Sequence, residues 1–309
     1  MLTKAVILTL IGALGTCDLP AGDLKDPHYW GQVFLDKYEV ERTRAVAELE
    51  PGPPPLAVPR TVLLVTGVTI PAEWFDPIVL RLERDGFRPV VYEPPDLLSG
   101  SLFHNAHLLG QEVDRVRALT GEDKIDILAE CTGGVIARHY IQALGGDRHV
   151  RRVVSFISPH HGIDKAPAAA AIAGWPALHD LSPGSEFLRT VTGTPLPDDV
   201  AFTSIYTCTD EYIQPYQTSI VPGATNIGLC DRKVGHFQFF YDPEIYLLMH
   251  GALTAPVADD EVIDPADPGA NDGASGGCAA AGGASGGAGA LLLLAAIAVT
   301  GRRRRAVRR

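Results

Sequence analysis

A cysteine lies in a setting that is typical of a catalytic nucleophile. Residues 129–134 read AECTGG, between an apolar run at 125–129 that predicts a strand and a predicted helix over 133–144. A nucleophile on a sharp strand-to-helix turn needs small residues two positions before and after it, because the flanking backbones approach closely. Ala129 and Gly133 meet this need around Cys131. Taken alone, Cys131 fits equally well a buried structural cysteine in an ordinary loop.

Two later loops carry an acid and a histidine in a matching order. Asp210 comes shortly after a predicted strand at 202–206. His236 follows the predicted strand at 225–229 and precedes a predicted helix at 241–253. The order Cys131, Asp210, His236 is the nucleophile, acid and histidine order of α/β-hydrolases. Residues 65–69, VTGVT, end another predicted strand and can offer a backbone N–H across the turn.

The elements that must position these residues alternate along the chain. Strands are predicted at 61–65, 88–92, 125–129, 153–157, 202–206 and 225–229, with helices over 71–86, 101–119, 133–144 and 241–253. Such alternation predicts right-handed crossovers and a mostly parallel sheet of about six strands covered by helices on both faces. The fold class is therefore α/β. A charged helix over 29–49 and the breaker PGPPP at 51–55 precede this pattern.

Several motifs carry a resemblance to a known family. They read FISPHHG at 156–162, LSPGSEFL at 181–188, SIYT at 204–207, TDE at 209–211 and VGHF at 234–237. With them, the segment from about 62 to 253 resembles bacterial triacylglycerol lipases and esterases of the α/β-hydrolase fold. The resemblance implies that Asp210 and His236 are the triad acid and base, and that the backbone N–H groups of Val68 and Thr132 form an oxyanion hole.

The chain departs from the family pattern around the nucleophile. Cys131 replaces the usual serine, Glu130 replaces the histidine before it, and Thr66 replaces the histidine of the oxyanion turn. A thiol ionises more easily than a hydroxyl, and Cys-His-Asp sites of this kind resemble those of dienelactone hydrolases. Glu130 places negative charge beside the thiol, which we expect to raise its pKa.

The resulting interpretation is an exported hydrolase that cleaves carboxylic, lipid-like esters through an acyl-enzyme on Cys131. The alternative is a catalytically degenerate surface protein that keeps the groove to bind an acyl chain or a partner. Residues 166–178, APAAAAIAGWPAL, predict a short helix over the mouth of the site. We expect it to be a lid in which Ile172, Trp175 and Leu178 meet the acyl chain or a lipid surface. Ordinary packing against the sheet is the competing interpretation.

Other cysteine, histidine and acidic residues point to a disulfide but not to a metal site. Cys208 and Cys230 flank the acid loop and predict a disulfide in an exported protein. We expect no cofactor and no metal. The adjacent His160 and His161 rarely point at one ion, and the acidic residues 259–261 lack the alternating spacing of a calcium loop.

The two ends of the sequence have the features of targeting segments. Residues 1–17 predict a signal peptide, and LGTC at 14–17 is an imperfect lipobox in which Cys17 would be lipidated. Residues 18–59 predict a helical extension and a Pro-rich linker, 60–255 the hydrolase domain, and 256–290 an acidic and then Gly/Ala/Ser-rich linker. Residues 291–309 are an apolar segment followed by arginines. Together with Cys278, this end resembles the C-terminal sorting tails of exported myxobacterial proteins.

These ends predict export, with the protein at the cell surface or outer membrane, or secreted after the tail is processed. Anchoring by the tail or by lipidation is part of that expectation. The formal net charge of −11 argues against nucleic acid as the partner. We expect a monomer whose partner is an ester or lipid substrate.

Overall fold

The computed structural model describes residues 22–47 and 49–257. The predicted signal peptide, the linker beyond 257 and the apolar, Arg-rich end lie outside these residues. All described elements belong to one compact unit. Within them, no helix has the length and apolar character needed to cross a membrane.

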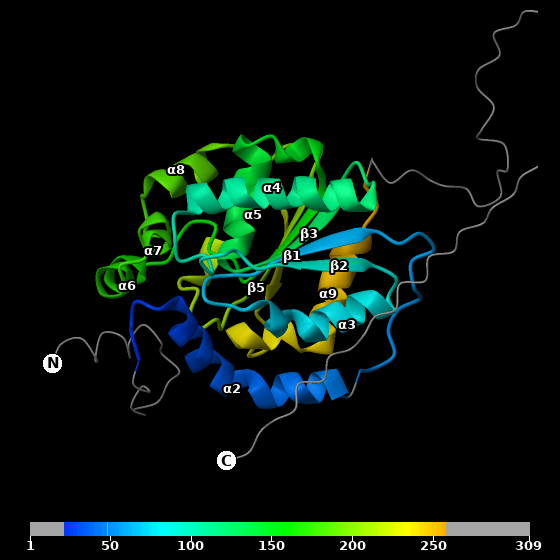
Figure 1. The fold of residues 1–309 in the computed structure, drawn as a ribbon, viewed down its shortest axis with the longest axis horizontal. Coiled ribbons are helices and arrows are strands. Elements are labelled where there is room, and N and C mark those ends of the chain that lie inside the picture. Colours follow the sequence, from blue (N-terminus) through cyan, green and yellow to red (C-terminus); the bar gives the residue numbers. More distant parts are fainter. Residues whose placement is uncertain (1–21, 48, 258–309) are drawn as a thin grey trace, which may run out of the picture. The chain divides into compact units, whose positions relative to one another are not determined.

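Six parallel strands form one sheet, as the sequence predicts (Figure 1). Their order is β2-β1-β3-β4-β5-β6. β1 and β3 are buried along their whole length, because helices cover both faces of a parallel sheet. Val65 pairs with Ala129, so the loop after β1 begins beside the turn that carries Cys131. The strands are β1 Thr61–Val65, β2 Arg88–Tyr92, β3 Ile125–Glu130, β4 Val150–Phe156, β5 Ala201–Thr207 and β6 Thr225–Leu229.

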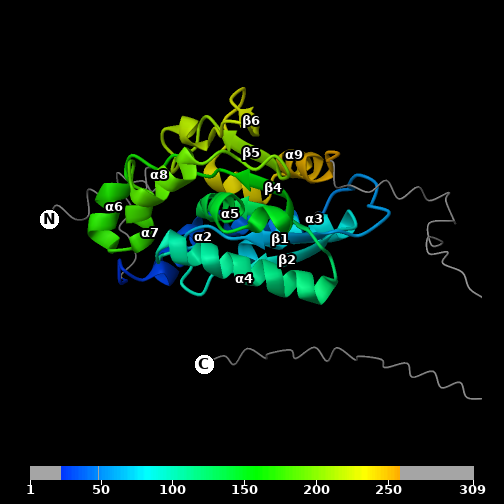
Figure 2. The ribbon, with the colours of Figure 1, turned by 90° about the horizontal axis from the view of Figure 1, so that it is seen from above.

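Helices lie on both faces of the sheet (Figures 1 and 2). The apolar core on one face includes residues of α4 Leu102–Thr120, α5 Thr132–Ala143 and α8 Glu186–Gly193. The core on the other face includes residues of α3 Asp76–Arg84, α9 Pro243–Thr254 and the 3-10 helices η1 Ala72–Phe75 and η4 His236–Phe240. Two further 3-10 helices are η2 Gly146–Arg148 and η3 Tyr216–Ser219.

Three helices gather at one end of the sheet. α6 Ala166–Ala173 and α7 Pro176–Asp180 lie next to the beginning of α2 Pro27–Ala47, which comes from the predicted helical extension (Figure 1). Apolar side chains of α2, α6 and the turn before α7 form a small core of their own, which includes Trp30 and Trp175. Trp175 Nε1 donates a hydrogen bond to the carbonyl oxygen of Lys25 at 2.8 Å. The segment just before α2 is thereby attached to the predicted lid.

The N-terminus of α4 is capped by a side chain from another helix. Ser101 occupies the N-cap position, but its side chain makes no capping hydrogen bond. The first N–H of the helix, that of Leu102, donates instead to Oδ2 of Asp180 at 2.8 Å. A carboxylate at a helix N-terminus is stabilised by the unsatisfied N–H groups there, so α7 supplies the cap across 78 residues.

Candidate active site

Cys131 lies on a strained turn between β3 and α5. Its backbone has φ 47° and ψ −120°, a conformation that side-chain-bearing residues rarely adopt outside functional sites. A Cβ atom added at Gly133 would lie 2.7 Å from the carbonyl oxygens of both Val65 and Thr66. The turn therefore needs glycine at this position, which is the close approach that the sequence motif predicts.

His236 and Asp210 form the second half of the site. Nδ1 of His236 lies 2.8 Å from Oδ2 of Asp210, and both side chains are buried. The other carboxylate oxygen of Asp210 accepts the backbone N–H groups of Tyr212 at 2.8 Å and Ile213 at 2.7 Å. Asp210 is thus fixed by its own loop and orients the imidazole, with Nε2 directed to the opposite side. One ligand atom each of Glu130, Cys131 and His236 lies within 4.8 Å of the others.

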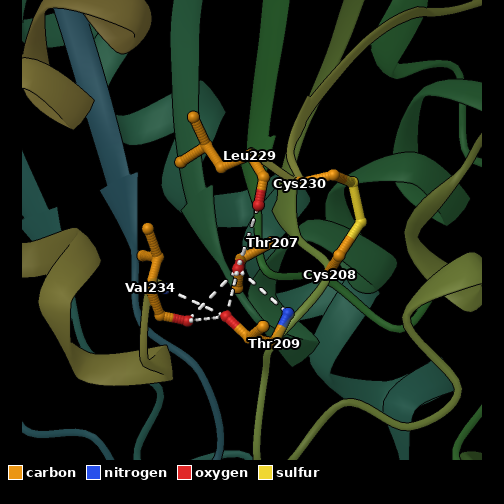
Figure 3. Close-up of a disulfide and its surroundings, with 6 residues drawn as sticks. All are labelled: Thr207, Cys208, Thr209, Leu229, Cys230 and Val234. Carbon is orange, nitrogen blue, oxygen red and sulfur yellow. Dashed lines mark hydrogen bonds between the residues drawn. A yellow bond between two sulfur atoms is a disulfide. The ribbon is translucent and has the colours of Figure 1, made fainter. Parts of the chain in front are cut away.

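A disulfide and two threonines join the acid loop to the histidine loop (Figure 3). Cys208 and Cys230 are bonded, as predicted. Thr209 Oγ1 donates to the carbonyl oxygen of Val234 at 3.0 Å and accepts its N–H at 2.9 Å. Thr207 Oγ1 donates to the same carbonyl at 3.1 Å. Because Thr209 precedes Asp210 and Val234 lies two residues before His236, these bonds set the spacing of acid and base.

Glu130 is the least expected member of the site. Its side chain is completely buried, and Oε1 lies 3.3 Å from Nε2 of His236. The carboxylate fits only because residue 67 is glycine: a Cβ at Gly67 would lie 2.1 Å from Oε2. The imidazole therefore has a carboxylate on each side, Asp210 at Nδ1 and Glu130 at Nε2. Sequence reasoning found the charge of Glu130 but not its contact with the base.

Burial and charge shift the pKa of each group. Burial alone lowers the pKa of His236, but Asp210, together with Cys131 and Glu130, raises it well above its usual value. Burial raises the pKa of Glu130, although His236 opposes this. Burial, and then Glu130, raises the pKa of the Cys131 thiol, with His236 and Thr132 acting in the opposite direction. The imidazole holds its proton firmly, and the thiol resists ionisation.

An apolar cavity of about 180 Å³ opens at this cluster. Val68 and Thr132, the predicted oxyanion-hole residues, line it beside Cys131. The predicted lid residues line it too, as do two aromatic residues of α2 that sequence reasoning missed. Those two residues, Trp30 and Phe34, are four positions apart and so share one helix face, which was the available signal. The lid and α2 residues are Ile172, Trp175, Leu178, Trp30 and Phe34.

The two histidines after β4, His160 and His161, have different surroundings. His160 is buried and its Nε2 lies 3.0 Å from Ser155 Oγ. His161 is exposed, and its Nδ1 lies 3.0 Å from the carbonyl oxygen of Thr218. The two rings have different partners and share no metal-ligating group among the described residues.

Sequence comparison relates the chain to a thioesterase family model and to a lipase. The family model described as palmitoyl protein thioesterase matches residues 101–222, which include Cys131 and Asp210 but neither Val68 nor His236. Lipase B of Pseudozyma antarctica is 26% identical over 171 residues, 53% of this chain and 49% of that lipase.

Solved structures show the same fold. The propeptide form of a Bacillus licheniformis lipase matches with a TM-score of 0.55 at 15% identity, covering 67% of this chain and 53% of that one. Lipase B of Aspergillus fumigatus matches with a TM-score of 0.55 at 20% identity, covering 65% and 55%. The chain spans about half the length of these relatives. Its fold is that of the α/β-hydrolases, and its sequence is lipase- and esterase-like.

Proposed function

We propose that this protein is a hydrolase of carboxylic esters or thioesters that works through an acyl-enzyme on Cys131. The observation that carries the proposal is the strained Cys131 turn facing a His236 ring that Asp210 holds at 2.8 Å. A backbone conformation of this kind persists only where the surrounding structure enforces it, and such strain clusters at active sites. The match to the thioesterase family model and to lipase B supports the same class of reaction.

In the proposed reaction, Nε2 of His236 takes the thiol proton, and the thiolate of Cys131 attacks the acyl carbonyl carbon. The N–H groups of Val68 and Thr132 bind the resulting oxyanion, and one such donor contributes on the order of 100-fold or more in rate. The alcohol or thiol leaves with the proton from His236, which leaves a thioester on Cys131. A water molecule, deprotonated by His236, then releases the acid and restores the thiol.

The cavity indicates an apolar acyl group. Its walls are mainly alkyl and aromatic side chains, and its volume of about 180 Å³ is below the roughly 300–1,000 Å³ of most small-molecule pockets. A long acyl chain therefore requires the wall formed by Ile172, Trp175 and Leu178 to move, as a lid does. Because Trp175 is bonded to the backbone of Lys25, such opening would also loosen the start of α2.

A non-catalytic acyl-binding protein is the second candidate, and Glu130 favours it. Its Oε1 lies 3.3 Å from the same Nε2 that must accept the thiol proton. An imidazolium held between two carboxylates has no free base to offer, so the buried thiol stays protonated. The fold, the cavity and the lid would then serve to hold an acyl chain without cleaving it.

Turnover and trapping measurements separate the two candidates. The full chain is assayed with fluorogenic short- and long-chain esters and thioesters, beside Cys131→Ala and the surface variant His107→Ala. Intact-mass analysis after rapid quenching detects an acyl group on the protein. Turnover that Cys131→Ala abolishes and His107→Ala retains supports the hydrolase. Acyl-chain binding without turnover in all three proteins would establish the binding protein instead.

We also propose that the protein acts outside the cytoplasm, anchored at or released from the cell surface. The Cys208–Cys230 disulfide supports this, because disulfides persist in oxidising compartments. Fractionation of cells that express the full chain, with and without residues 291–309, tests it. Recovery of both forms in the cytoplasm would contradict the proposal.

A further inference from the structure

Glu130, Cys131 and His236 bring three kinds of metal ligand to one buried point. A carboxylate oxygen, a thiol sulfur and an imidazole nitrogen lie within 4.8 Å of one another. The covalent mechanism uses Cys131 and His236 but gives Glu130 no part. A fully buried carboxylate without a role in the chemistry needs a physical explanation, because isolated buried charge is strongly unfavourable.

The Glu130 carboxylate is fully buried, and its polar neighbours are the His236 ring and the backbone N–H of Gly67, which both oppose the rise of its pKa on burial. Oε1 lies 3.3 Å from Nε2 of His236, which is ion-pair distance when the imidazole is protonated. Oε2 points at the space that a side chain at position 67 would fill, and Gly67 leaves that space open. Glu130 is thus a fully buried carboxylate that contacts the imidazole of His236 and is directed into the cluster.

The spacing of these atoms is close to that of a tetrahedral zinc site. In a tetrahedral site, metal–ligand distances of about 2.1 Å place the nitrogen and oxygen ligands roughly 3.4 Å apart. The observed distance between His236 Nε2 and Glu130 Oε1 is 3.3 Å. With a Zn–S distance of about 2.3 Å, the sulfur should lie roughly 3.6 Å from each of them. Since the three atoms already lie within 4.8 Å of one another, each separation from the sulfur needs to shorten by at most about 1.2 Å.

Asp210 completes the arrangement on the far side of the imidazole. Its Oδ2 is 2.8 Å from Nδ1 of His236, which fixes the proton on Nδ1 and leaves the Nε2 lone pair for a metal. A carboxylate behind a ligating histidine is the usual support of zinc-binding histidines. The Cys131 thiolate and the Glu130 carboxylate together balance the two charges of the ion, so the occupied site is neutral and suits burial.

We propose that Glu130, Cys131 and His236 form a binding site for Zn²⁺, with Asp210 supporting the histidine. Binding forms Zn–S, Zn–N and Zn–O bonds and releases to solvent the thiol proton and any proton held between Glu130 and His236. The three ligands line the apolar cavity, so water or a substrate oxygen from the cavity can take the fourth coordination position of the ion. Because the ion occupies the sulfur and Nε2, zinc binding and acylation of Cys131 exclude each other.

The test uses cobalt as a spectroscopic probe for zinc. The full chain carries Cys17→Ala and Cys278→Ala, since those thiols could bind metal elsewhere, and it is stripped with a chelator. Co²⁺ should then give a thiolate-to-cobalt charge-transfer band and tetrahedral visible bands at one ion per chain, and one equivalent of Zn²⁺ should remove them. Cys131→Ala should abolish the charge-transfer band. Asp210→Asn should weaken binding by about 10- to 100-fold, while the exposed His107→Ala should bind as the parent does.

A second readout needs no change inside the site. Stoichiometric Zn²⁺ should protect Cys131 of the parent chain from iodoacetamide, and a chelator should restore alkylation. A missing charge-transfer band, bands that survive Cys131→Ala, or alkylation unaffected by Zn²⁺ would each overturn the proposal. Metal binding does not depend on ester cleavage, so a chain that binds zinc but cleaves nothing refutes only the hydrolase. A chain that cleaves esters but binds no zinc refutes only the metal site.

Discussion

The carboxylate of Glu130 lies 3.3 Å from Nε2 of His236, the one ring atom that can take a proton from Cys131. The other ring nitrogen, Nδ1, is already hydrogen-bonded to Asp210. Two acids therefore compete with one thiol for a single imidazole. Most of the chemistry that can be tested in this protein depends on which of them holds the proton.

Replacing Glu130 by Gln should make Cys131 more reactive. The change removes the negative charge that, after burial, raises the pKa of the thiol, and it keeps the size of the side chain. We expect the pH midpoint of iodoacetamide alkylation, measured with a chelator present, to fall by about one unit. Glu83→Gln, at an exposed glutamate of α3, is the control. An unchanged midpoint in Glu130→Gln would show that the carboxylate does not act on the thiol.

Replacing Trp175 and Leu178 by Ser should affect long substrates most. Both side chains line the cavity, so their loss should weaken turnover of aggregated long-chain esters much more than that of soluble short-chain esters. The comparison is the ratio of kcat/KM for the two substrates. Leu119→Ser, at an exposed leucine of α4, controls for the loss of an apolar side chain. Equal losses on both substrates, with a lower Tm, would mean that these residues are simply core.

Gly133→Ala should disturb the turn that carries Cys131. The added Cβ would lie 2.7 Å from two backbone oxygens that cannot easily move, and overpacking of this kind destabilises a fold by about 1–3 kcal/mol. Denaturant unfolding measures this loss, and turnover should fall as well. At Gly193 a Cβ meets nothing within 4 Å, so Gly193→Ala should change stability by less than about 0.5 kcal/mol. Similar effects at both glycines would disprove the close approach.

His160 should make the protein less stable in acid. Burial, followed by the charges of Arg138 and His161, holds the pKa of His160 well below its usual value, so the folded ring stays neutral. The unfolded chain takes up a proton at this position below about pH 6.5, and the free energy of unfolding therefore decreases as the pH falls through that point. The contribution is fully present above about pH 7.

Denaturant titrations of His160→Asn between pH 8 and pH 5 should show a shallower slope than the parent. The difference can reach about 1.4 kcal/mol per pH unit, the limit for one proton. His107→Asn removes an exposed histidine and serves as the comparison. Identical slopes for the parent and His160→Asn would mean that this ring is protonated in the folded protein too.

The sequence alone determined the sheet, the turn and the order of the triad candidates. β1, β2 and β6 begin and end at the predicted residues, and the breakers Pro59, Gly86 and Gly223 each lie two residues before one of these strands. The turn at Cys131 was predictable because its small neighbours are a local requirement. The Cys208–Cys230 disulfide followed from the positions of two cysteines around one loop.

Only the tertiary structure decided what surrounds the imidazole and what closes the cavity. Glu130 and His236 are 106 positions apart, and Trp30 meets Trp175 across 145 positions. No local pattern encodes such contacts, because they depend on how β3, η4, α2 and α6 pack together. Residue type gives a charge or an apolar surface, but the partner that a buried carboxylate meets is set by packing. That partner here is His236, the proposed catalytic base.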